Sequence, residues 1–426
     1  MRLCFYNPHA INNSLGETLI SKLAEIFGTD KNNLKKHNRK HEYLLNYLKD
    51  KKYHTAIVVD GAGTSLSTIF DEIPVLKNTH LVYEIVSAVE IYIWCWLNNI
   101  NFFKQTIIFD ANKLNRETDI LFGYACSTEI FLNRKLLEKS IIKAFTGKKI
   151  LHGSHFYGST SRVAENIRFS NTKYMVAEAD LKKSPYFRKF FGFIKGTYIL
   201  PNVLRDRYVK TRNFDERKNT CLALGTLVIN PEGDLVNKDH FNFFKINTLH
   251  PMRKIIYENR DKLGDVIDCL INFHNEKRIV VGSKFKFYNT RKIFRILYDL
   301  FFLSEGKNYH RLDIVQKYNE YKMFISPEEN IGLPSVNFSE GMACGCAYIG
   351  LDHPMYIDLG MRDKKNYIAY NGTIEDLNRK ILYYQSHGDK LKKIAEEGYE
   401  FAREIFSQEK VTRNFWEYLE KLSKQK

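Results

Sequence analysis

Residues 327–350, PEENIGLPSVNFSEGMACGCAYIG, are the part of the chain best suited to bind a phosphorylated ligand. A strand-like run ends at Ser326, a Gly-containing loop follows, and an apolar helix is predicted from about Ser335. In open α/β sheets, ligands bind beyond the carboxyl ends of strands, where a helix N-terminus offers N–H groups and a positive dipole end to a phosphate. Gly332, Leu333 and Ser335 are therefore predicted to receive a diphosphate.

Two glutamates in this segment could hold hydroxyl groups of the same ligand. Glu340 lies a turn or more into the predicted helix, where a carboxylate can accept both hydroxyls of a ribose. Glu329 lies in the loop and could hold sugar hydroxyls, and its neighbour Glu328 competes for that role. Without Glu340, the Gly-Leu-Pro turn and apolar helix would be an ordinary loop.

At these residues the chain resembles the retaining group of GT-B glycosyltransferases, which includes sucrose synthase and many bacterial lipopolysaccharide and capsule enzymes. Residues 329–334 (ENIGLP) are similar to the family's E-G-F-G-L-P, and residues 340–345 (EGMACG) to its E-A-M-A-x-G. Ten residues separate the two glutamates, about three more than in the family. Residues 198–203 (YILPNV) look like its I-P-N-G-V, and residues 407–422 are similar to its final helix.

The resemblance implies a GT-B fold, in which two Rossmann-like domains face each other across a cleft and a C-terminal helix crosses back to the first domain. It implies that the first glutamate contacts the donor sugar and the second the nucleotide ribose. It also implies retention, with the donor phosphate assisting deprotonation of the acceptor. An inverting enzyme would need a base, and Asp60, Glu178 and Asp180 are the candidates.

The chain departs from the family in the cations that neutralise the leaving diphosphate. Gly225 and Thr226 stand where the family has G-R, and an insertion of roughly twenty residues separates them from a helix start at His250. We assign leaving-group stabilisation to Arg253, with Lys254 as the alternate, because positive charge at a departing phosphate is a large catalytic effect. Thr226 could add its hydroxyl. Alternatively, both cations could simply lie in solvent at the start of a helix, without contacting a ligand.

The N-terminal half offers further candidates by the same resemblance. The family places groups facing donor and acceptor in the loop after the first strand, where Asn13, Ser14 and Gly16 lie here. It often has a histidine contacting the donor sugar from this lobe. His155 lies just past a predicted strand end, and His152 is nearly as well placed. The alternative for His155 is a hydrogen-bonded structural histidine.

The elements that must position these residues alternate between strand and helix in both halves, which is typical of parallel sheets covered on both faces. Strands are predicted at residues 2–6, 55–60, 105–109, 149–151, 174–177 and 197–200, then at 221–229, 278–282, 322–326 and 346–351. Together with the resemblance, this predicts an acceptor-side domain over residues 1–203, a nucleotide-sugar-binding domain over 204–406 and a returning helix over 407–426. The polar stretch 205–219 reads as the connection between the domains.

Composition narrows the class of protein. The length of 426 residues exceeds what one hydrophobic core usually supports. The seven cysteines are odd in number and lie in apolar contexts, which favours reduced thiols and a cytoplasmic location. Cys344 and Cys346 lack a second pair at finger spacing, and the chain has no D-x-D motif, so we expect no metal. The apolar window 81–97 contains two glutamates and is predicted to be a buried amphipathic helix rather than a membrane span.

The net charge of +16 favours an anionic partner. Cations gather in residues 31–40 and 181–195, and the second stretch interleaves them with Tyr186, Phe187, Phe190, Phe191 and Phe193. Such a pattern suits single-stranded nucleic acid or an anionic membrane surface, but helical spacing of the aromatics also fits a core face. Of the two functional options we favour peripheral contact with the cytoplasmic membrane.

These observations predict a glycosyltransferase that moves a sugar from a nucleotide-sugar donor to a glycan or lipid-linked acceptor, without nucleic acid as a partner. The resemblance implies retention and a place in bacterial lipopolysaccharide or capsule biosynthesis. A nucleotide-sugar epimerase on the same fold is one alternative. A basic RNA-binding protein is another, which the glutamate-containing loop disfavours.

Overall fold

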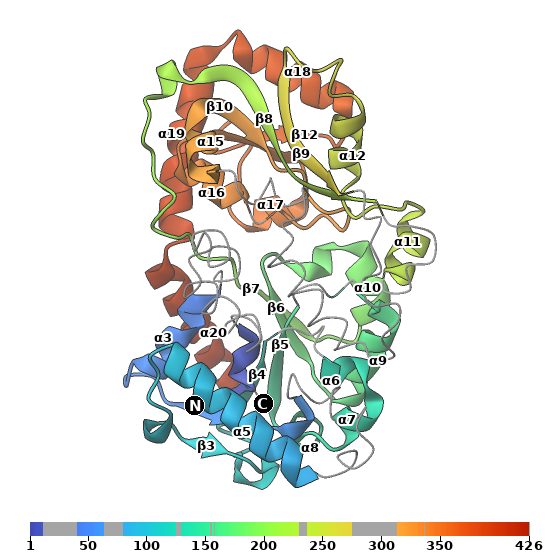
Figure 1. The fold of residues 1–426 in the computed structure, drawn as a ribbon, viewed down its shortest axis with the longest axis vertical. Coiled ribbons are helices and arrows are strands. Elements are labelled where there is room, and N and C mark those ends of the chain that lie inside the picture. The colour runs from blue at the N-terminus through green and yellow to red at the C-terminus, as the bar shows by residue number, and fades with distance from the viewer. Residues whose placement is uncertain are drawn as a thin grey trace, which may run out of the picture.

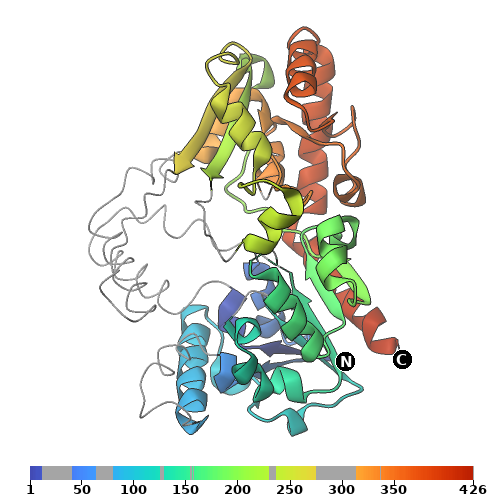
Figure 2. The same ribbon diagram turned by 90° about the vertical axis from the view of Figure 1, so that its right-hand side faces the viewer.

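The computed structural model describes residues 1–11, 41–63, 80–124, 129–153, 156, 158–229, 237–274, 313–335 and 337–425. Two lobes, each built on a parallel sheet, are stacked along the long axis of the molecule (Figure 1). Figure 2 shows the C-terminal helices running along both lobes. Several residues predicted from sequence lie outside the described residues, namely Asn13, Ser14, Gly16, His155, the basic stretch 31–40 and the strand predicted at 278–282.

The first lobe contains a seven-stranded sheet in the order β3-β2-β1-β4-β5-β6-β7. Every recorded pairing in it is parallel. Its strands are β1 (Arg2–Tyr6), β2 (Thr55–Val58), β3 (Ile107–Ile108), β4 (Asp119–Gly123), β5 (Lys148–His152), β6 (Tyr174–Ala177) and β7 (Gly196–Ile199). The sequence analysis missed β4, which pairs directly with β1.

Alternation of side chains along each strand builds a core on both faces of this sheet. Cys4 and Tyr6 of β1 lie in one cluster of buried residues, while Leu3 and Phe5 lie in another. The helices described in this lobe are α3 (Leu45–Lys49), α5 (His80–Leu97), α6 (Glu129–Leu132), α7 (Arg134–Glu138), α8 (Ile141–Ala144), α9 (Thr160–Phe169) and α10 (Pro185–Phe191).

The aromatic side chains of the basic stretch 181–195 belong mainly to the core. Tyr186, Phe187 and Phe191 of α10 are fully buried and pack with Phe156. The structure therefore supports the interpretation that these aromatic residues form the core-facing side of a helix. These three rings are not available to a membrane or a nucleic acid, because they already pack against neighbouring side chains.

The second lobe contains a five-stranded parallel sheet in the order β12-β11-β10-β8-β9. Its strands are β8 (Lys218–Val228), β9 (Ile267–His274), β10 (Tyr321–Ile325), β11 (Ala347–Leu351) and β12 (Ile368–Tyr370). Its described helices are α11 (Lys238–Phe244), α12 (Pro251–Glu258), α15 (Ile314–Glu320), α16 (Phe338–Ala343), α17 (Pro354–Asp358), α18 (Ile374–Gln385) and α19 (Gly388–Ile405). β8 lies between β10 and β9, and neither β9 nor β12 was predicted from the sequence.

The last helix, α20 (Gln408–Lys424), returns to the first lobe. Ser407 caps it, since its hydroxyl accepts from the amide of Lys410. Phe415 packs with Phe5 and Phe122 in the core of the first lobe, and Tyr418 stacks on Tyr198 with ring centroids 4.1 Å apart. The predicted fold class, two Rossmann-like domains joined by a returning C-terminal helix, is confirmed.

Candidate functional site

The two lobes meet at a small cavity to which both sheets contribute. Its first-lobe walls are Glu178, directly after β6, and Pro201 and Asn202, after β7. The second lobe adds Pro334, Phe338, Ser339, Leu359 and Phe406. The loops at the carboxyl ends of strands from two parallel sheets therefore face each other, which is where open α/β folds bind ligands.

The loop after β10, which carries the predicted donor-binding residues, is held in place by hydrogen bonds. The hydroxyls of Ser326 and Ser335 lie 2.7 Å apart and connect its two ends. The amide of Asn330 donates to the carbonyl of Leu249 at 2.9 Å and ties its middle to the segment before α12. The helix predicted from about Ser335 begins only at Phe338 and is six residues long.

Gly332 is required for the shape of this loop. Its φ of +86° lies in the left-handed region, and a Cβ at this position would come within 2.7 Å of the His353 ring. Its amide donates to the carbonyl of Glu329 at 2.9 Å, so that N–H is already paired within the loop. Leu333 is half-buried and Ser335 buried.

The sequence analysis missed His353, which packs against this glycine. It precedes α17, and its Nδ1 accepts a hydrogen bond from the amide of Met355 at 3.2 Å. Burial lowers the pKa of His353, which favours the neutral ring. Nothing in its local sequence indicates a role at the loop, because the contact exists only in the folded chain.

The structure separates the two competing glutamates Glu328 and Glu329. Glu328 is buried and points into the second lobe, where its carboxylate accepts from the hydroxyl of Tyr370 at 2.9 Å and that of Tyr356 at 3.4 Å. Burial raises the pKa of Glu328, and the tyrosine hydrogen bonds oppose that rise. Glu329 is half-buried in the loop. Of the two, Glu329 is the less buried residue.

Glu340 lies in α16, with its side chain 11% exposed, and pairs with a residue from the connection between the lobes. Arg205 Nη2 donates to Glu340 Oε1 at 3.2 Å and to the hydroxyl of Tyr208 at 3.0 Å. Arg207 also donates to Tyr208. Burial raises the pKa of Tyr208, and Glu340 adds to that rise. The sequence analysis treated this segment only as a polar connection, since it has no periodicity to indicate a contact.

Arg253, Gly225 and Thr226 meet at the carboxyl end of the second sheet. The Arg253 guanidinium donates to the carbonyls of Pro327, at 3.2 and 3.0 Å, and Thr226, at 3.1 Å. Gly225 has a φ of +146°, and a Cβ there would come within 2.7 Å of the guanidinium. The chain therefore needs glycine at this position to admit the arginine. These contacts place a buried positive charge under the loop. Arg253 is therefore not simply a solvent-exposed residue at the start of a helix.

Lys254 lies on a different face of α12. Its ammonium lies 3.8 Å from Glu258 in the next turn, and it lines a groove of about 540 Å³ with Asn242 and Thr248. Neighbouring residues of a helix point about 100° apart. Arg253 and Lys254 therefore do not converge on one ligand. Lys254 fits the alternative interpretation, a residue at the solvent-facing surface of a helix start.

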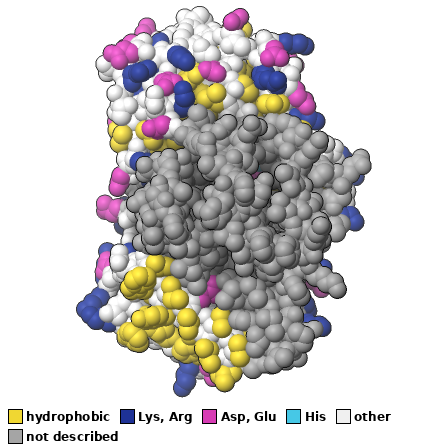
Figure 3. Space-filling model, viewed as in Figure 1, with side chains coloured by type: hydrophobic (Ala, Val, Ile, Leu, Met, Phe, Trp, Pro, Cys, Tyr) yellow, Lys and Arg dark blue, Asp and Glu magenta, His cyan; other side chains and the backbone are white. Residues whose placement is uncertain are grey.

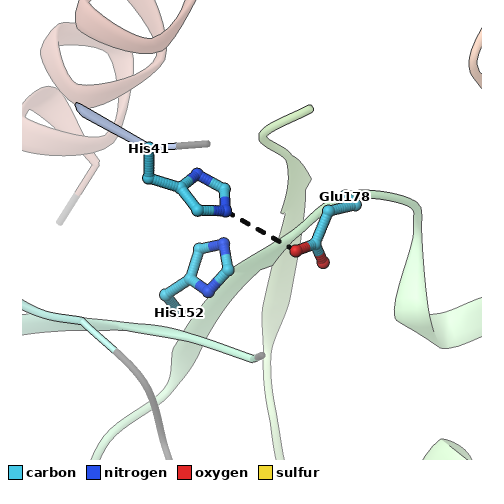
Figure 4. A group of neighbouring side chains, drawn as sticks. All are labelled: His41, His152 and Glu178. Carbon is cyan, nitrogen blue, oxygen red and sulfur yellow. Dashed lines mark ion pairs between the residues drawn. The ribbon is translucent and has the colours of Figure 1, made fainter. Parts of the chain in front are cut away.

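On the first-lobe side, the structure brings together His41, His152 and Glu178 (Figure 4). His152 ends β5 and Glu178 follows the adjacent strand β6. His41 Nε2 lies 3.6 Å from Glu178 Oε1, and the two histidine rings are 4.5 Å apart between centroids. Tyr124 stacks on His152 at 4.9 Å. His152 and Glu178 were separate candidates from the sequence, and His41 was not predicted.

The charge of Glu178 is set by this cluster. Burial would raise the pKa of Glu178, but His41 and His152 together outweigh it and hold that pKa below its usual range. One ligand atom from each of the three residues lies within 4.8 Å of the others. Two imidazoles and a carboxylate form a donor set that zinc sites use, so these are the described residues that could hold a metal.

The other two acids considered as bases are engaged in structural contacts. Asp60 accepts from the hydroxyl of Tyr6 at 2.8 Å and from the amide of Ile141 at 2.6 Å. Asp180 accepts from the hydroxyl of Thr197 at 2.7 Å and caps a short helix. Of the three candidates, Glu178 is the one that lines the cavity between the lobes.

No protein-family profile matches the sequence, and no curated protein sequence matches it. Solved structures with a similar fold include HepE of Anabaena in complex with UDP and glucose, at 11% identity and a TM-score of 0.46 over 99% of this chain and 100% of that one. Sucrose-phosphate synthase from Thermosynechococcus elongatus has 8% identity and a TM-score of 0.48, with 99% of each chain covered. A glycosyltransferase from Rickettsia africae has 13% identity and a TM-score of 0.44, over 100% of this chain and 99% of that one.

Proposed function

We propose that the protein is a glycosyltransferase that moves a sugar from a nucleotide-sugar donor to a glycan or lipid-linked acceptor. The observation that carries this proposal is the cavity between the lobes. There, the loop and helix that contain Glu329 and Glu340 face Glu178 of the first lobe. A donor held by one sheet and an acceptor held by the other would meet at that point.

On the donor side, Glu340 binds the ribose hydroxyls and Glu329 positions the sugar. Arg205, which already pairs with Glu340, fixes the carboxylate and brings positive charge close to the nucleotide. The buried guanidinium of Arg253 stabilises the negative charge that develops on the departing diphosphate, because a fixed charge in a low-dielectric site needs no reorganisation during the reaction. Gly332, Leu333 and Ser335 shape the phosphate-binding loop.

On the acceptor side, Glu178 orients the attacking hydroxyl. Its ionised carboxylate can accept that hydroxyl's hydrogen bond, and His41 and His152 keep it ionised. The motif resemblance favours retention, in which the donor phosphate removes the acceptor proton. Glu178 would then be a positioning group rather than the base.

We further propose that the reaction is metal-independent and serves bacterial surface-polysaccharide assembly. Arg253 and Arg205 are the cations that would replace a divalent ion at the diphosphate. The support for the pathway is the likeness of the motifs at Glu329 and Glu340 to lipopolysaccharide and capsule enzymes.

Thermal-shift screening against UDP-, GDP-, CMP- and dTDP-sugars tests the donor class. One nucleotide family should raise the melting temperature, because a ligand that binds only the folded state stabilises it by mass action. Incubation with that donor, followed by NMR of the products, should show a glycoside with the donor's anomeric configuration. A free isomerised sugar nucleotide would identify an epimerase instead, and stabilisation by none of the donors would contradict the proposal.

A further inference from the structure

Helix α5 presents an apolar stripe to solvent along its whole length. Leu81, Ile85, Val89, Tyr92 and Trp96 are 65, 54, 51, 44 and 70% exposed. Steps of three and four residues place all five on one face of a helix. Figure 3 shows hydrophobic side chains gathered over this part of the first lobe. We term these five residues, with Phe103, the α5 surface.

The helix predicted here was a buried amphipathic one. One face of α5 is indeed buried, but the exposed face is apolar rather than polar. Ile91, Trp94 and Cys95 are buried in the core of the first lobe. Glu90 is 1% exposed, so its charge does not interrupt the stripe. A long, uncharged and exposed apolar stripe is rare on a soluble monomer and indicates an interaction site.

Aromatic rings and cations adjoin the C-terminal end of the stripe. Phe103 is 82% exposed, and its ring lies 5.8 Å from that of Tyr92. Lys104 is exposed directly after it. Gln105 donates to the carbonyl of Leu48 at 3.1 Å, so the backbone of the exposed Lys49, the next residue, lies close to Gln105.

We propose that the α5 surface docks the protein on an anionic phospholipid bilayer, with α5 lying in the plane of the interface. A single exposed helix that combines aliphatic residues, aromatic residues and neighbouring lysines suits the boundary between headgroups and acyl chains. The net charge of +16 is complementary to anionic lipid. No helix among the described residues is both long and apolar enough to cross a bilayer.

We prefer this surface to the stretch 181–195 as the membrane contact. Tyr186, Phe187 and Phe191 of that stretch are in the core, and Phe190 and Phe193 are half-buried, whereas Tyr92 and Trp96 of α5 are exposed. Membrane binding can be measured without substrate, so the inference does not depend on the proposed transferase activity. The two can therefore fail separately.

Co-sedimentation with phosphatidylcholine vesicles, with and without about 30% phosphatidylglycerol, tests the proposal. Binding should require the anionic lipid and weaken with salt. The double variant Ile85→Asp/Val89→Asp should lower the partition coefficient at least about tenfold, because it places two charges at the acyl boundary. Leu382→Asp is the matched control, since Leu382 is 48% exposed on helix α18 of the other lobe, and it should bind as the wild type does.

Brominated acyl chains report the depth of the contact. They should quench tryptophan fluorescence in the wild type, and Trp96→Phe should remove most of that quenching. The alternative occupant is a second copy of the chain, which sedimentation velocity would detect. A dimer that Ile85→Asp/Val89→Asp dissociates, or vesicle binding equal in that variant and the wild type, would overturn the proposal.

Discussion

The guanidinium of Arg205 donates to the carboxylate of Glu340 across 3.2 Å and joins the connection between the lobes to α16. Glu340 is buried in α16, the helix whose Phe338 and Ser339 line the cavity between the lobes, and we propose that it holds the nucleotide ribose. We expect Glu340→Ala to weaken the affinity for both nucleotide and nucleotide sugar by about 1.5 to 3 kcal/mol, the usual size of a hydrogen bond to a charged group. A carboxylate that binds ribose contributes equally in ground and transition states, so turnover should change little.

Calorimetry with the nucleoside diphosphate measures this directly. Glu375→Ala is the control, because Glu375 is exposed in the first turn of α18 and touches no part of the cavity walls. An affinity that is unchanged in Glu340→Ala, with the fold intact, would reject the assignment of Glu340 to the ribose.

Glu329→Gln should lower turnover and leave the affinity for the nucleoside diphosphate nearly intact. The reason is that Glu329 is proposed to act as charge develops at the anomeric carbon, and not on the nucleotide. Steady-state kinetics with the full donor, beside calorimetry with the diphosphate, separates the two effects. Loss of diphosphate affinity in Glu329→Gln would place this residue on the nucleotide instead.

Glu328→Gln should alter the pH dependence of stability. Burial raises the folded-state pKa of Glu328 above its unfolded value, so between the two values the folded chain binds more protons. The free energy of unfolding contributed by this group is therefore highest at acid pH and falls as pH rises through that window. Urea unfolding from pH 4 to 7 should show Glu328→Gln gaining stability relative to the wild type as pH rises. Parallel pH profiles would contradict this.

Gly332→Ala should destabilise the protein by about 1 to 3 kcal/mol, since it forces a positive φ on alanine and a clash with the His353 ring. Gly388→Ala is the control, because no atom lies within 4 Å of the position its Cβ would take. The double variant Gly332→Ala/His353→Ala should lose less stability than the sum of the two single changes. Simple additivity in urea unfolding would show that the two positions are not in contact.

Activity should persist in EDTA, and elemental analysis of the purified protein should find less than one metal ion per chain. The physical reason is that Arg253 and Arg205 supply fixed positive charge on the donor side. His41→Ala tests the one group of described residues that could hold an ion, and the exposed His54 provides the control His54→Ala. One zinc ion per chain, lost in His41→Ala together with activity, would refute metal independence.

The sequence alone determined the fold class and the location of the candidate donor site. The fold class could be predicted because strands and helices have local hydrophobic patterns. The candidate donor site could be predicted because Glu329, Gly332 and Glu340 lie close together in the chain, so their spacing forms a recognisable motif. The strands β4, β9 and β12 were missed.

Only the tertiary structure decided which side chains meet. Arg205 reaches Glu340 over a separation of 135 residues. His152 meets Glu178 because β5 and β6 are adjacent, and His41 joins them from the segment before α3. Glu328 and Glu329 are neighbours in sequence, yet one is buried under tyrosines and the other lies in the loop. Such contacts depend on packing between distant segments, whereas local periodicity records only which face of its own element a residue occupies.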